Sequence, residues 1–479
     1  MKIRLHKDAF FRNYNGIGYL FQQKDSRNLI LDKNGIVFFQ FINRKAQDIN
    51  IICKKICAMY TNANISVIKD DFITFMSKME SLNFVIMDKS AEQMKKNLIN
   101  ENSLQNIPDN QEKTKNLTVN EKDNIDTFLQ KYFDKSPRLV FLEIEITPNC
   151  NLKCVHCYLG CGSSHQSQHK RMSIRTIYKV LREFRAMGGL QVSFTGGEAM
   201  LNKDLPKLLK YARKLDLSIT ILTNAVLLDD SLLKVIKETN VAKIQVSLYS
   251  MQAKVHNSIT QVKESFQKSK QSIEKLLDNN ITVQIGCPVM RENLNSFTEI
   301  LKWGDKHKVK VRLDGTIIAR QNFSDDNLNH RLNLIEQEKF INDTIKYNIN
   351  YQKRLLNNVG KSIEILPEDV ICGAGRYMLC LQANGNYCPC PGFGLVVGNC
   401  KQSLEEVWNN SKELNKLRDL TNSSYKECME CSARNYCNLC PSKFYNESGG
   451  DMFKISDYFC QVAHLTKKIA EDFVKRHKK

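Results

Sequence analysis

The sequence predicts an α/β fold built around a parallel sheet, and two observations lead to this prediction. Between residues 138 and 315, strand-like apolar runs alternate with amphipathic helical patterns in six successive steps. Strands that alternate with helices in this way form parallel sheets with right-handed crossovers. The chain also changes character on both sides of this region, with short strands and helices before it and a cysteine-rich segment after it. We therefore expect a central α/β domain between two smaller ones.

The composition is that of a globular chain, with 42% hydrophobic and 25% charged residues among 479. No apolar run reaches transmembrane length, and the start MKIRLHKDAFF lacks the apolar core of a signal peptide. These features predict a cytoplasmic protein without a membrane segment. In that compartment, the 17 cysteines favour metal ligation over disulfides.

The formal net charge is +19, and the excess comes mostly from lysines scattered along the chain. Two interpretations of this charge remain open. The lysines can simply solvate the surface, or they can attract an acidic partner such as an acidic peptide or a nucleic acid.

Residues 1–95 are expected to form a small winged-helix-like α+β domain, because strand-like runs precede three helical patterns. A plain packing domain or a DNA-binding domain would show the same order. Cys53 and Cys57 are assigned to its core, since two thiols do not complete a metal site. Residues 96–136 are rich in Asn, Lys, Glu, Asp and Gln and are expected to be a polar linker. The strand-like runs are Lys2–Leu5, Gly18–Phe21 and Asn28–Leu31, and the helical patterns cover 35–41, 49–59 and 72–79.

Residues 137–365 are expected to form the central α/β domain. The predicted strands are 139–146, 191–197, 218–224, 243–249, 281–287 and 310–314, and the predicted helices are 174–184, 204–215, 231–239, 269–278 and 295–303.

Cys150, Cys154 and Cys157 form a C-x3-C-x2-C pattern between Thr147 and Gly160. They follow the first predicted strand, so they lie on a loop at its C-terminal end, where α/β folds place their chemistry. Three thiolates leave one iron of a 4Fe–4S cluster without a protein ligand, and that iron can chelate a small molecule. A partly formed zinc site, or cysteines used as small apolar residues, are the alternatives.

This pattern, with Tyr158 after its last cysteine, resembles the signature of the radical S-adenosylmethionine (radical SAM) superfamily. The resemblance implies a cluster whose free iron binds the amino and carboxylate groups of S-adenosylmethionine (SAM). It also implies reductive cleavage of SAM to a 5′-deoxyadenosyl radical, which abstracts hydrogen from a substrate. Six strand–helix steps rather than eight agree with the open, partial (β/α)6 TIM-type barrel of that superfamily.

A Gly-Gly-Glu segment follows the second predicted strand. Gly196, Gly197 and Glu198 resemble the GGEP motif of the superfamily, although Ala199 replaces the proline. The resemblance implies that this segment holds the amino group of the SAM methionine moiety. Glycines let a backbone approach a ligand closely, and a carboxylate accepts hydrogen bonds from an ammonium group.

Asn224 and Ser247 end two successive strands of the predicted sheet. In the superfamily, an Asn or Ser at such positions contacts the SAM ribose or carboxylate, so the resemblance implies this role here. A polar loop residue satisfied by the backbone would also end a strand in this way. The arginine expected downstream of Ser247 is missing from HNSITQVKESF, so the contact to the SAM carboxylate is unassigned. The sequence identifies no catalytic base.

Residues 366–479 contain the second cysteine-rich pattern, whose two CxxC pairs alone would also fit a zinc ribbon. The order of its cysteines resembles the SPASM domain, the auxiliary-cluster extension of radical SAM enzymes. It departs from that pattern in one spacing, since two residues separate Cys437 from Cys440 where three are usual. The resemblance implies two auxiliary 4Fe–4S clusters, and therefore three 4Fe–4S clusters in the chain. The implied ligands are Cys372, Cys380, Cys390 and Cys440 for the first and Cys428, Cys431, Cys437 and Cys460 for the second.

Cys388 and Cys400 are left over in this assignment. Cys388 lies two residues before Cys390 and can exchange roles with it. In sulfatase-maturing members, an aspartate base directly follows the cysteine of this G-x4-C segment. Here the residue is Pro391, whose ring cannot accept a proton, and this difference argues against that activity.

The resemblance covers nearly the whole chain and implies an enzyme that modifies a ribosomally made precursor peptide. Residues 1–95 also resemble domains in which a leader peptide adds as a strand to a sheet edge. The expected partners are that peptide and a reductant such as flavodoxin or ferredoxin, with no membrane and no nucleic acid. A Cys-to-carbon thioether is the favoured product, and a carbon–carbon or carbon–oxygen crosslink or an epimerisation is the alternative. An iron–sulfur redox-sensing DNA-binding regulator is the alternative from a different class, although the Gly-Gly-Glu segment has no role in it.

Overall fold

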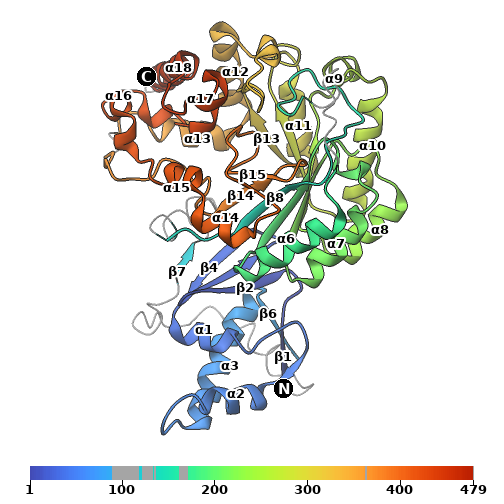
Figure 1. Ribbon diagram of the computed structural model, residues 1–479, viewed down its shortest axis with the longest axis vertical. Coiled ribbons are helices and arrows are strands. Elements are labelled where there is room, and N and C mark those ends of the chain that lie inside the picture. Colours follow the sequence, from blue (N-terminus) through green and yellow to red (C-terminus); the bar gives the residue numbers. More distant parts are fainter. Residues whose placement is uncertain (89–117, 121–132, 134–135, 161–170, 362–363, 478–479) are drawn as a thin grey trace. The chain divides into compact units, whose positions relative to one another are not determined.

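The computed structural model describes residues 1–88, 118–120, 133, 136–160, 171–361 and 364–477. The chain forms two compact units (Figure 1). The first contains Met1–Tyr132 with Asp216–Ser218, and the second contains Phe133–Leu215 with Ile219–Lys479. Within the described ranges, no helix is long and apolar enough to cross a membrane.

The N-terminal unit contains two antiparallel sheets. Three strands of the first form a meander, and a short fourth strand, β7, pairs with the outer edge of β4, where Leu29 lies opposite Val119. In the second sheet, β1 lies between β5 and β6. The strands are β1 (Lys2–Leu5), β2 (Ala9–Tyr14), β3 (Ile17–Gln22), β4 (Arg27–Leu31), β5 (Gln47–Asp48), β6 (Val85–Asp88) and β7 (Thr118–Asn120).

Three helices complete this unit: α1 (Lys33–Phe39), α2 (Ile49–Cys57) and α3 (Ile65–Ser81). Each begins at a capping side chain, because Asp32, Asp48 and Asn64 accept hydrogen bonds from N–H groups of the first turn. The apolar sides of the helices pack with the strands into one core, which includes Cys53 as predicted.

The prediction of a small N-terminal α+β domain is confirmed, with more strands than expected. The sequence missed β2 because apolar Phe10 and Phe11 point to opposite faces, so the strand shows no alternation. Most of the predicted linker, residues 96–136, lies outside the described residues. Its described part includes β7, so this segment contributes a strand to the first sheet.

The second unit is organised around a sheet in which β8 to β13 lie side by side in chain order. The pairings of β8 with β9, β10 with β11, β11 with β12 and β12 with β13 are all parallel, as in the register of Phe141 with Gln191. The predicted parallel α/β sheet is therefore confirmed, with its strands close to the expected positions. The strands are β8 (Phe141–Glu145), β9 (Gln191–Thr195), β10 (Ser218–Thr223), β11 (Lys243–Ser247), β12 (Val283–Pro288) and β13 (Lys310–Asp314).

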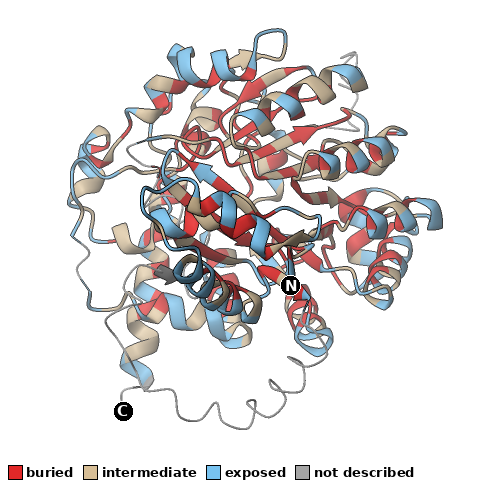
Figure 2. Ribbon diagram, turned by 90° about the horizontal axis from the view of Figure 1, so that it is seen from below, coloured by how far each residue is buried: buried red, intermediate tan, exposed pale blue. Residues whose placement is uncertain are grey.

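Helices follow the strands and lie along one side of the sheet (Figure 1). On β8, buried and partly exposed side chains alternate. Leu142 and Ile144 are fully buried, and Glu143 between them keeps some exposure. Figure 2 shows buried residues along the strands and on the helix sides that face them. The helices are α6 (Ile174–Ala186), α7 (Leu205–Lys214), α8 (Asp230–Glu238), α9 (Ala253–Thr260), α10 (Ser265–Asp278), α11 (Phe297–His307), α12 (Leu334–Tyr347) and α13 (Ile349–Leu356).

The cysteine-rich segment continues the same sheet beyond β8. Strand β14 (Met378–Leu381) pairs in parallel with β8, with Cys380 beside Glu143. It turns into β15 (Asn386–Cys388), which pairs antiparallel with β16 (Gly398–Asn399). The sequence did not predict this extension of the sheet. The segment ends in the helices α14 (Leu404–Asn410), α15 (Lys412–Arg418), α16 (Lys426–Met429), α17 (Pro441–Ser448) and α18 (Asp457–His477).

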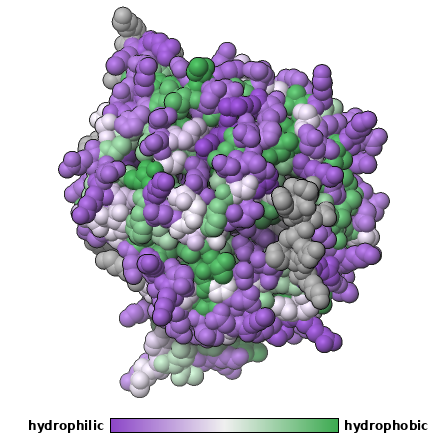
Figure 3. All heavy atoms as spheres, turned by 45° about the horizontal axis from the view of Figure 1, so that its top comes forward, coloured by the Kyte–Doolittle hydropathy of each residue, from purple (hydrophilic) through white to green (hydrophobic). Residues whose placement is uncertain are grey.

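Charged and other polar side chains predominate on the face drawn in Figure 3, where hydrophobic residues lie scattered among them. This agrees with the lysine-rich composition of the chain.

The sequence analysis predicted neither α9, α12 and α13 of the central region nor the helices α14 to α18 of the cysteine-rich segment. For α12 a usable signal was present, because Asn333 and Glu336 form a capping box at its start.

Candidate functional site

The loop of Cys150, Cys154 and Cys157 leaves the C-terminal end of β8, as predicted. It is held in place by backbone hydrogen bonds, since the N–H groups of Lys153 and Val155 donate to the carbonyls of Thr260 and Ile259 at the end of α9. Helix α9 therefore supports a loop that has no regular structure of its own.

The three thiols of this loop influence one another. Burial, together with the charge of the neighbouring Cys157, raises the pKa of Cys150 to about 11 and that of Cys154 to about 12. Thiols gathered in this way lose their protons when a metal binds, because the cation stabilises the thiolates. The loop therefore has the soft sulfur donors and the irregular backbone that iron–sulfur ligation requires.

The Gly-Gly-Glu segment packs directly against this loop. The N–H of Gly197 donates to Thr147 O at 2.9 Å, and the N–H of Glu198 donates to Asn149 O at 2.8 Å. A Cβ on Gly196 would lie 2.3 Å from Thr147 O, and a Cβ on Gly197 would lie 2.3 Å from Asn149 O. Both glycines are needed for this close approach between two backbones, a reason that the sequence did not reveal.

Glu198 is buried, and its carboxylate joins the ends of β9 and β10. Its Oε1 accepts hydrogen bonds from Thr223 Oγ1 at 2.5 Å and Met200 N at 2.9 Å, and its Oε2 accepts one from Asn224 N at 2.7 Å. Burial raises the pKa of Glu198, and these donors lower it. A carboxylate has about four acceptor positions, so one on Oε2 is left for a ligand.

Asn224 and Ser247 both lie near the cysteine loop. The side-chain amide of Asn224 donates to Asn151 Oδ1 at 2.8 Å, and its Nδ2 is 4.0 Å from Cys150 Sγ. Burial raises the pKa of the Tyr249 hydroxyl. A hydrogen bond with the side chain of Ser247 lowers this pKa, so Ser247 lies beside the hydroxyl. The structure therefore brings the five predicted cofactor-contact residues, on β9 to β11 and the loops after them, to the edge of the sheet that carries the cysteine loop.

Several residues at this edge were missed by the sequence analysis. The ring of Tyr249 lies between those of His156 and His256, at centroid distances of 4.8 and 5.3 Å, and its hydroxyl is 3.7 Å from Cys154 Sγ. The guanidinium of Arg320 donates to Cys157 O at 2.9 Å. No spacing in the sequence could have indicated the contacts of Tyr249 with His156 and Cys154 or of Arg320 with Cys157, because they join segments far apart in the chain.

The cysteines of the C-terminal segment fall into two neighbourhoods. In the first, burial raises the pKa of Cys390, and the nearby Cys372, Cys440 and Cys388 raise it further. Cys380 lies directly opposite Cys388 on the paired strands β14 and β15, and a hydrogen bond between their thiols raises the pKa of Cys380.

The second neighbourhood contains Cys428, Cys431, Cys437 and Cys460. Burial, together with the charges of Cys437 and Cys460, raises the pKa of Cys428 to about 11. The pKa of Cys437 is raised by burial and then by Cys460 and Cys431. A histidine that the sequence analysis missed, His464, places its Nε2 3.8 Å from Cys431 Sγ.

In the described ranges, every cysteine is free, and no three cysteine, histidine or carboxylate side chains already converge in a metal-binding geometry. Thiols of the cysteine loop and of the C-terminal segment nonetheless influence one another's pKa, and sulfur is the donor that iron–sulfur clusters use. The residues therefore fit such clusters in their chemistry.

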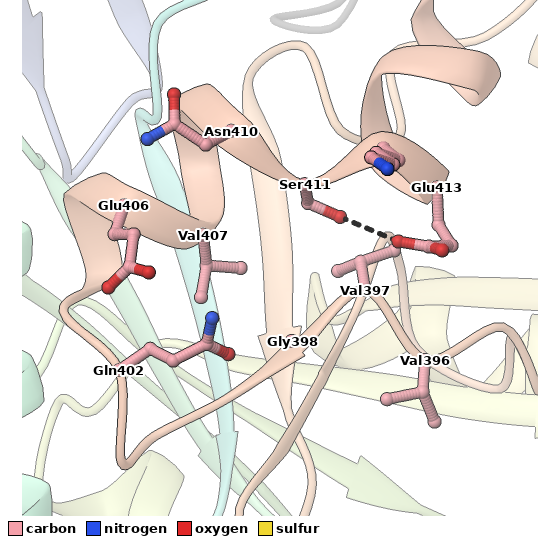
Figure 4. Close-up of a pocket in the computed structure, with 10 residues that line it drawn as sticks. Val396, Val397, Gly398, Gln402, Glu406, Val407, Asn410, Ser411 and Glu413 are labelled. Atoms are coloured by element: carbon pink, nitrogen blue, oxygen red, sulfur yellow. Dashed lines mark hydrogen bonds between the residues drawn. The ribbon is translucent and has the colours of Figure 1, made fainter.

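A pocket of about 460 Å³ lies between β16 and the helices α14 and α15 (Figure 4). Its lining includes Val396, Gln402 and Glu406, and Ser411 donates a hydrogen bond to Glu413 at its rim. None of its lining residues is a cysteine, so this pocket is separate from the cysteine groups.

Two family models match the chain. The model of the Radical SAM superfamily matches residues 144–304, and that of the SPASM iron–sulfur cluster-binding domain matches residues 372–432. These ranges contain the cysteine loop with the Gly-Gly-Glu segment, and the start of the C-terminal cysteine groups.

Curated relatives have low identity over most of their length. The antilisterial bacteriocin subtilosin biosynthesis protein AlbA of Bacillus subtilis is 28% identical over 65% of this chain and 69% of its own. An AdoMet-dependent heme synthase of Nitratidesulfovibrio vulgaris is 25% identical over 67% of this chain and 92% of its own. The PqqA peptide cyclase of Bradyrhizobium diazoefficiens is 22% identical over 61% of this chain and 78% of its own.

Solved structures share the fold. Streptococcus suis SuiB bound to its precursor peptide SuiA superposes with a TM-score of 0.61 at 17% identity, covering 96% of this chain and 100% of the other. The anSMEcpe enzyme with bound AdoMet has a TM-score of 0.57 at 18% identity and covers 70% of this chain and 97% of its own. Together with the cysteine loop, the two matched models show an enzyme with a radical SAM domain at residues 144–304 and an iron–sulfur cluster-binding SPASM domain at residues 372–432.

Proposed function

We propose that this enzyme modifies a ribosomally made precursor peptide. The observation that carries the proposal is the extent of the fold it shares with SuiB, which includes 96% of the chain and was solved with a precursor peptide bound. The heme synthase relative matches 67% of this chain and AlbA matches 65%, so the share covered does not separate these two relatives. AlbA and the PqqA cyclase, whose names refer to bacteriocin and peptide chemistry, also support a peptide substrate.

We assign the cysteine groups as follows. Cys150, Cys154 and Cys157 hold the cluster that binds SAM, with Gly196, Gly197, Glu198, Asn224 and Ser247 around the cofactor. Cys372, Cys380, Cys390 and Cys440 hold the first auxiliary cluster, and Cys428, Cys431, Cys437 and Cys460 hold the second. The expected content is about twelve iron atoms, four for each cluster.

When bound, the cluster and SAM would supply one-electron chemistry that lets the enzyme abstract hydrogen from the peptide. The protein's own residues hold this site in place. Helix α9 and Arg320 hold the cysteine loop by hydrogen bonds. The backbone of the Gly-Gly-Glu segment, which follows β9, also donates hydrogen bonds to the start of this loop. The one free acceptor position on Glu198 Oε2 suits the amino group of a bound methionine moiety.

A thioether between a cysteine sulfur and a carbon is the product we favour. Its formation removes one hydrogen atom from the carbon and one proton from the thiol, and leaves one electron that needs an acceptor. Two cysteine groups beyond the SAM-binding loop suit an oxidative crosslink of this kind. Carbon–carbon or carbon–oxygen crosslinking and epimerisation are the alternatives for the same residues. A flavodoxin or ferredoxin is the proposed source of the reducing electron.

The N-terminal unit is proposed to anchor the leader of the precursor as an added strand, because a tethered substrate has a high effective concentration at the reacting site. The edge of β4 suits such an addition, but in this structure β7 of the same chain pairs with it. A leader that binds there must therefore displace β7.

Anaerobic co-expression with short peptides encoded beside the gene, followed by mass spectrometry, tests the proposal. A thioether lowers the peptide mass by two hydrogen atoms and protects one cysteine from alkylation, whereas a carbon–carbon crosslink leaves that cysteine reactive. Epimerisation leaves the mass unchanged. The Cys150→Ala, Cys154→Ala, Cys157→Ala triple variant is the control and should leave every peptide unmodified. Specific binding of promoter DNA with no peptide product would instead favour the redox-sensing regulator.

A further inference from the structure

Tyr249 lies two residues after the end of β11 and is buried beside the cysteine loop. Its backbone is held on both sides, because its N–H donates to His256 Nδ1 at 3.2 Å and its carbonyl accepts from Asn293 Nδ2 at 2.8 Å. Its ring packs edge-on against His156 of the cysteine loop and stacks on His256 of α9. The position of the phenol ring is therefore set by groups from several segments of the chain.

The hydroxyl of this ring reaches a cysteine of the proposed SAM-binding cluster. Tyr249 Oη lies 3.7 Å from Cys154 Sγ, and either atom can be the donor while the cysteine is a thiol. A cysteine that binds a metal is a thiolate and has no proton to donate. In the loaded enzyme the tyrosine hydroxyl must therefore donate, and the sulfur accepts.

The single proton of the tyrosine hydroxyl also determines the role of Ser247. Once this proton is directed at the sulfur, the hydroxyl oxygen can only accept further hydrogen bonds. Ser247, the last residue of β11, forms a side-chain hydrogen bond with the same hydroxyl, so the serine is the donor in that bond. Ser247 thus donates to Tyr249, and Tyr249 donates to Cys154.

Cys150, in the same loop, has a donor of a different kind. The backbone N–H of Leu152 donates to Cys150 Sγ at 3.4 Å, so this donor belongs to the cysteine loop itself. It cannot be removed without changing the backbone that carries the cysteines. The hydroxyl of Tyr249 comes from the segment after β11 and can be removed while the ring and the loop stay in place.

We propose that Tyr249 is a positioning residue whose hydrogen bond to the Cys154 thiolate raises the reduction potential of the SAM-binding cluster, and that Ser247 keeps the tyrosine hydroxyl in the donating orientation. Reduction by one electron makes the cluster and its thiolates more negative, and a hydrogen-bond donor stabilises the more negative state more strongly. Hydrogen bonds to the sulfurs are among the factors that set the potential of such clusters. The inference rests on the proposed assignment of the cysteine loop as the ligands of this cluster, and not on the identity of the substrate.

The test is a redox titration of the anaerobically reconstituted full-length protein with dithionite, followed by electron paramagnetic resonance of the reduced clusters. SAM is left out, so that a contact of Ser247 with the cofactor does not enter the result. The signal of the SAM-binding cluster is the one that disappears in the Cys150→Ala, Cys154→Ala, Cys157→Ala triple variant. In Tyr249→Phe, the midpoint potential of this signal should become more negative. At one solution potential, the ratio of reduced to oxidised cluster should fall roughly fivefold or more, while the auxiliary signals stay where they are.

Two further variants separate the hydrogen bonds from the packing of the ring. Ser247→Ala keeps the tyrosine and its hydroxyl, and should shift the potential in the same direction by a smaller amount. Tyr249→Phe combined with Ser247→Ala should shift it no further than Tyr249→Phe alone, because the serine acts through the tyrosine. Tyr19→Phe is the matched control, since it removes a buried hydroxyl that donates to Asn28 in the N-terminal unit, and it should leave the potential unchanged.

Unchanged potentials in Tyr249→Phe and Ser247→Ala, at the iron content of wild type, would overturn the proposal. An equal shift in Tyr19→Phe would overturn it too, and shifts that add up in the double variant would show that the serine does not act through the tyrosine. If Tyr249→Phe fails to bind iron, Ser247→Ala decides the question, because it keeps the ring. If the triple cysteine variant keeps every signal, the assignment of the cysteine loop fails, and the proposal fails with it.

Discussion

The backbone N–H of Asn224 donates a 2.7 Å hydrogen bond to Oε2 of Glu198, and this bond links the ends of two strands beneath the cysteine loop. In Glu198→Gln, an NH₂ group replaces one of the two carboxylate oxygens. In either orientation of the amide, this NH₂ group faces a hydrogen-bond donor, either the N–H of Asn224 or the groups that donate to Oε1. We expect the variant to lose about 1–3 kcal/mol of unfolding free energy, the usual cost of an unsatisfied buried group. Urea unfolding without SAM measures this loss. Glu238→Gln, on the surface of α8, is the control and should stay within about 0.5 kcal/mol of wild type.

Gly197→Ala should disturb the cysteine loop rather than the sheet. The added Cβ would lie 2.3 Å from Asn149 O, a backbone atom that cannot yield without moving the loop. We expect iron bound after anaerobic reconstitution to fall by about a third, the share of one cluster in three. In Gly286→Ala, the Cβ meets only the end of the flexible Gln245 side chain, so full iron content is expected there. Equal iron content in both variants would contradict the proposed role of Gly197 in positioning the cysteine loop.

The roles of Cys388 and Cys390 can be separated by iron analysis. Cys390 shares its surroundings with Cys372 and Cys440, whereas Cys388 lies opposite Cys380 on the paired strands. We expect Cys390→Ser to lose auxiliary iron and Cys388→Ser to keep it, with the SAM-binding cluster intact in both. The reverse result would assign Cys388 as the ligand.

Stability should depend on pH through His256. Its Nδ1 accepts a hydrogen bond from Tyr249 N at 3.2 Å, so protonation at this atom would break the bond, and burial lowers the pKa of His256 to about 4. The unfolded chain, with an ordinary histidine pKa near 6.5, binds this proton more readily. The contribution of His256 is therefore complete above about pH 6.5 and is lost as the pH falls towards 4, by about 3 kcal/mol at most.

The free energy of unfolding, measured from pH 7 to pH 5, checks this expectation. The difference between wild type and His256→Asn should shrink as the pH falls, because asparagine does not titrate. Replacing the exposed His307 by Asn is the matched control and should leave the pH dependence of wild type unchanged.

Pairing of β7 with β4 should compete with leader binding. Neighbouring residues of an antiparallel strand alternate in whether they bond to the partner, so Val119→Pro with Asn120→Pro removes a donor of each kind. We expect this double variant to bind a fluorescent leader peptide more tightly than wild type, since the edge of β4 is then free. Unchanged affinity would mean that the leader does not use this edge.

Much of the site could be predicted because its signals are local. The cysteine loop, the Gly-Gly-Glu segment and the strand ends at Asn224 and Ser247 each depend on short spacings and on strands with clear alternation. The C-terminal cysteines were divided into two groups in the same way, because the SPASM pattern that they resemble depends on the order of cysteines along the chain. The ligand sets themselves stay predictions until iron is measured.

The remaining features depend on contacts between distant segments. The sequence around Glu145 shows a strand with an acid at its end, but nothing in it indicates that Gln321 and Ala383 lie beside that acid. Tyr249 likewise reaches Cys154 across 95 residues of sequence. Strand β14 looked like part of a cysteine motif, and only its partner β8 shows that it belongs to the central sheet.

The pairing of β14 with β8 also limits how this enzyme can be divided. A chain cut after residue 365 would leave the backbone donors and acceptors of β8 unpaired along Phe141–Ile144, at an edge that other molecules could join. Such a fragment would be prone to aggregate, and limited proteolysis should release no stable barrel from the intact protein. The cysteine-rich segment is therefore part of one folding unit with the barrel, and exchanging it between relatives would require exchanging the first strand of the barrel with it.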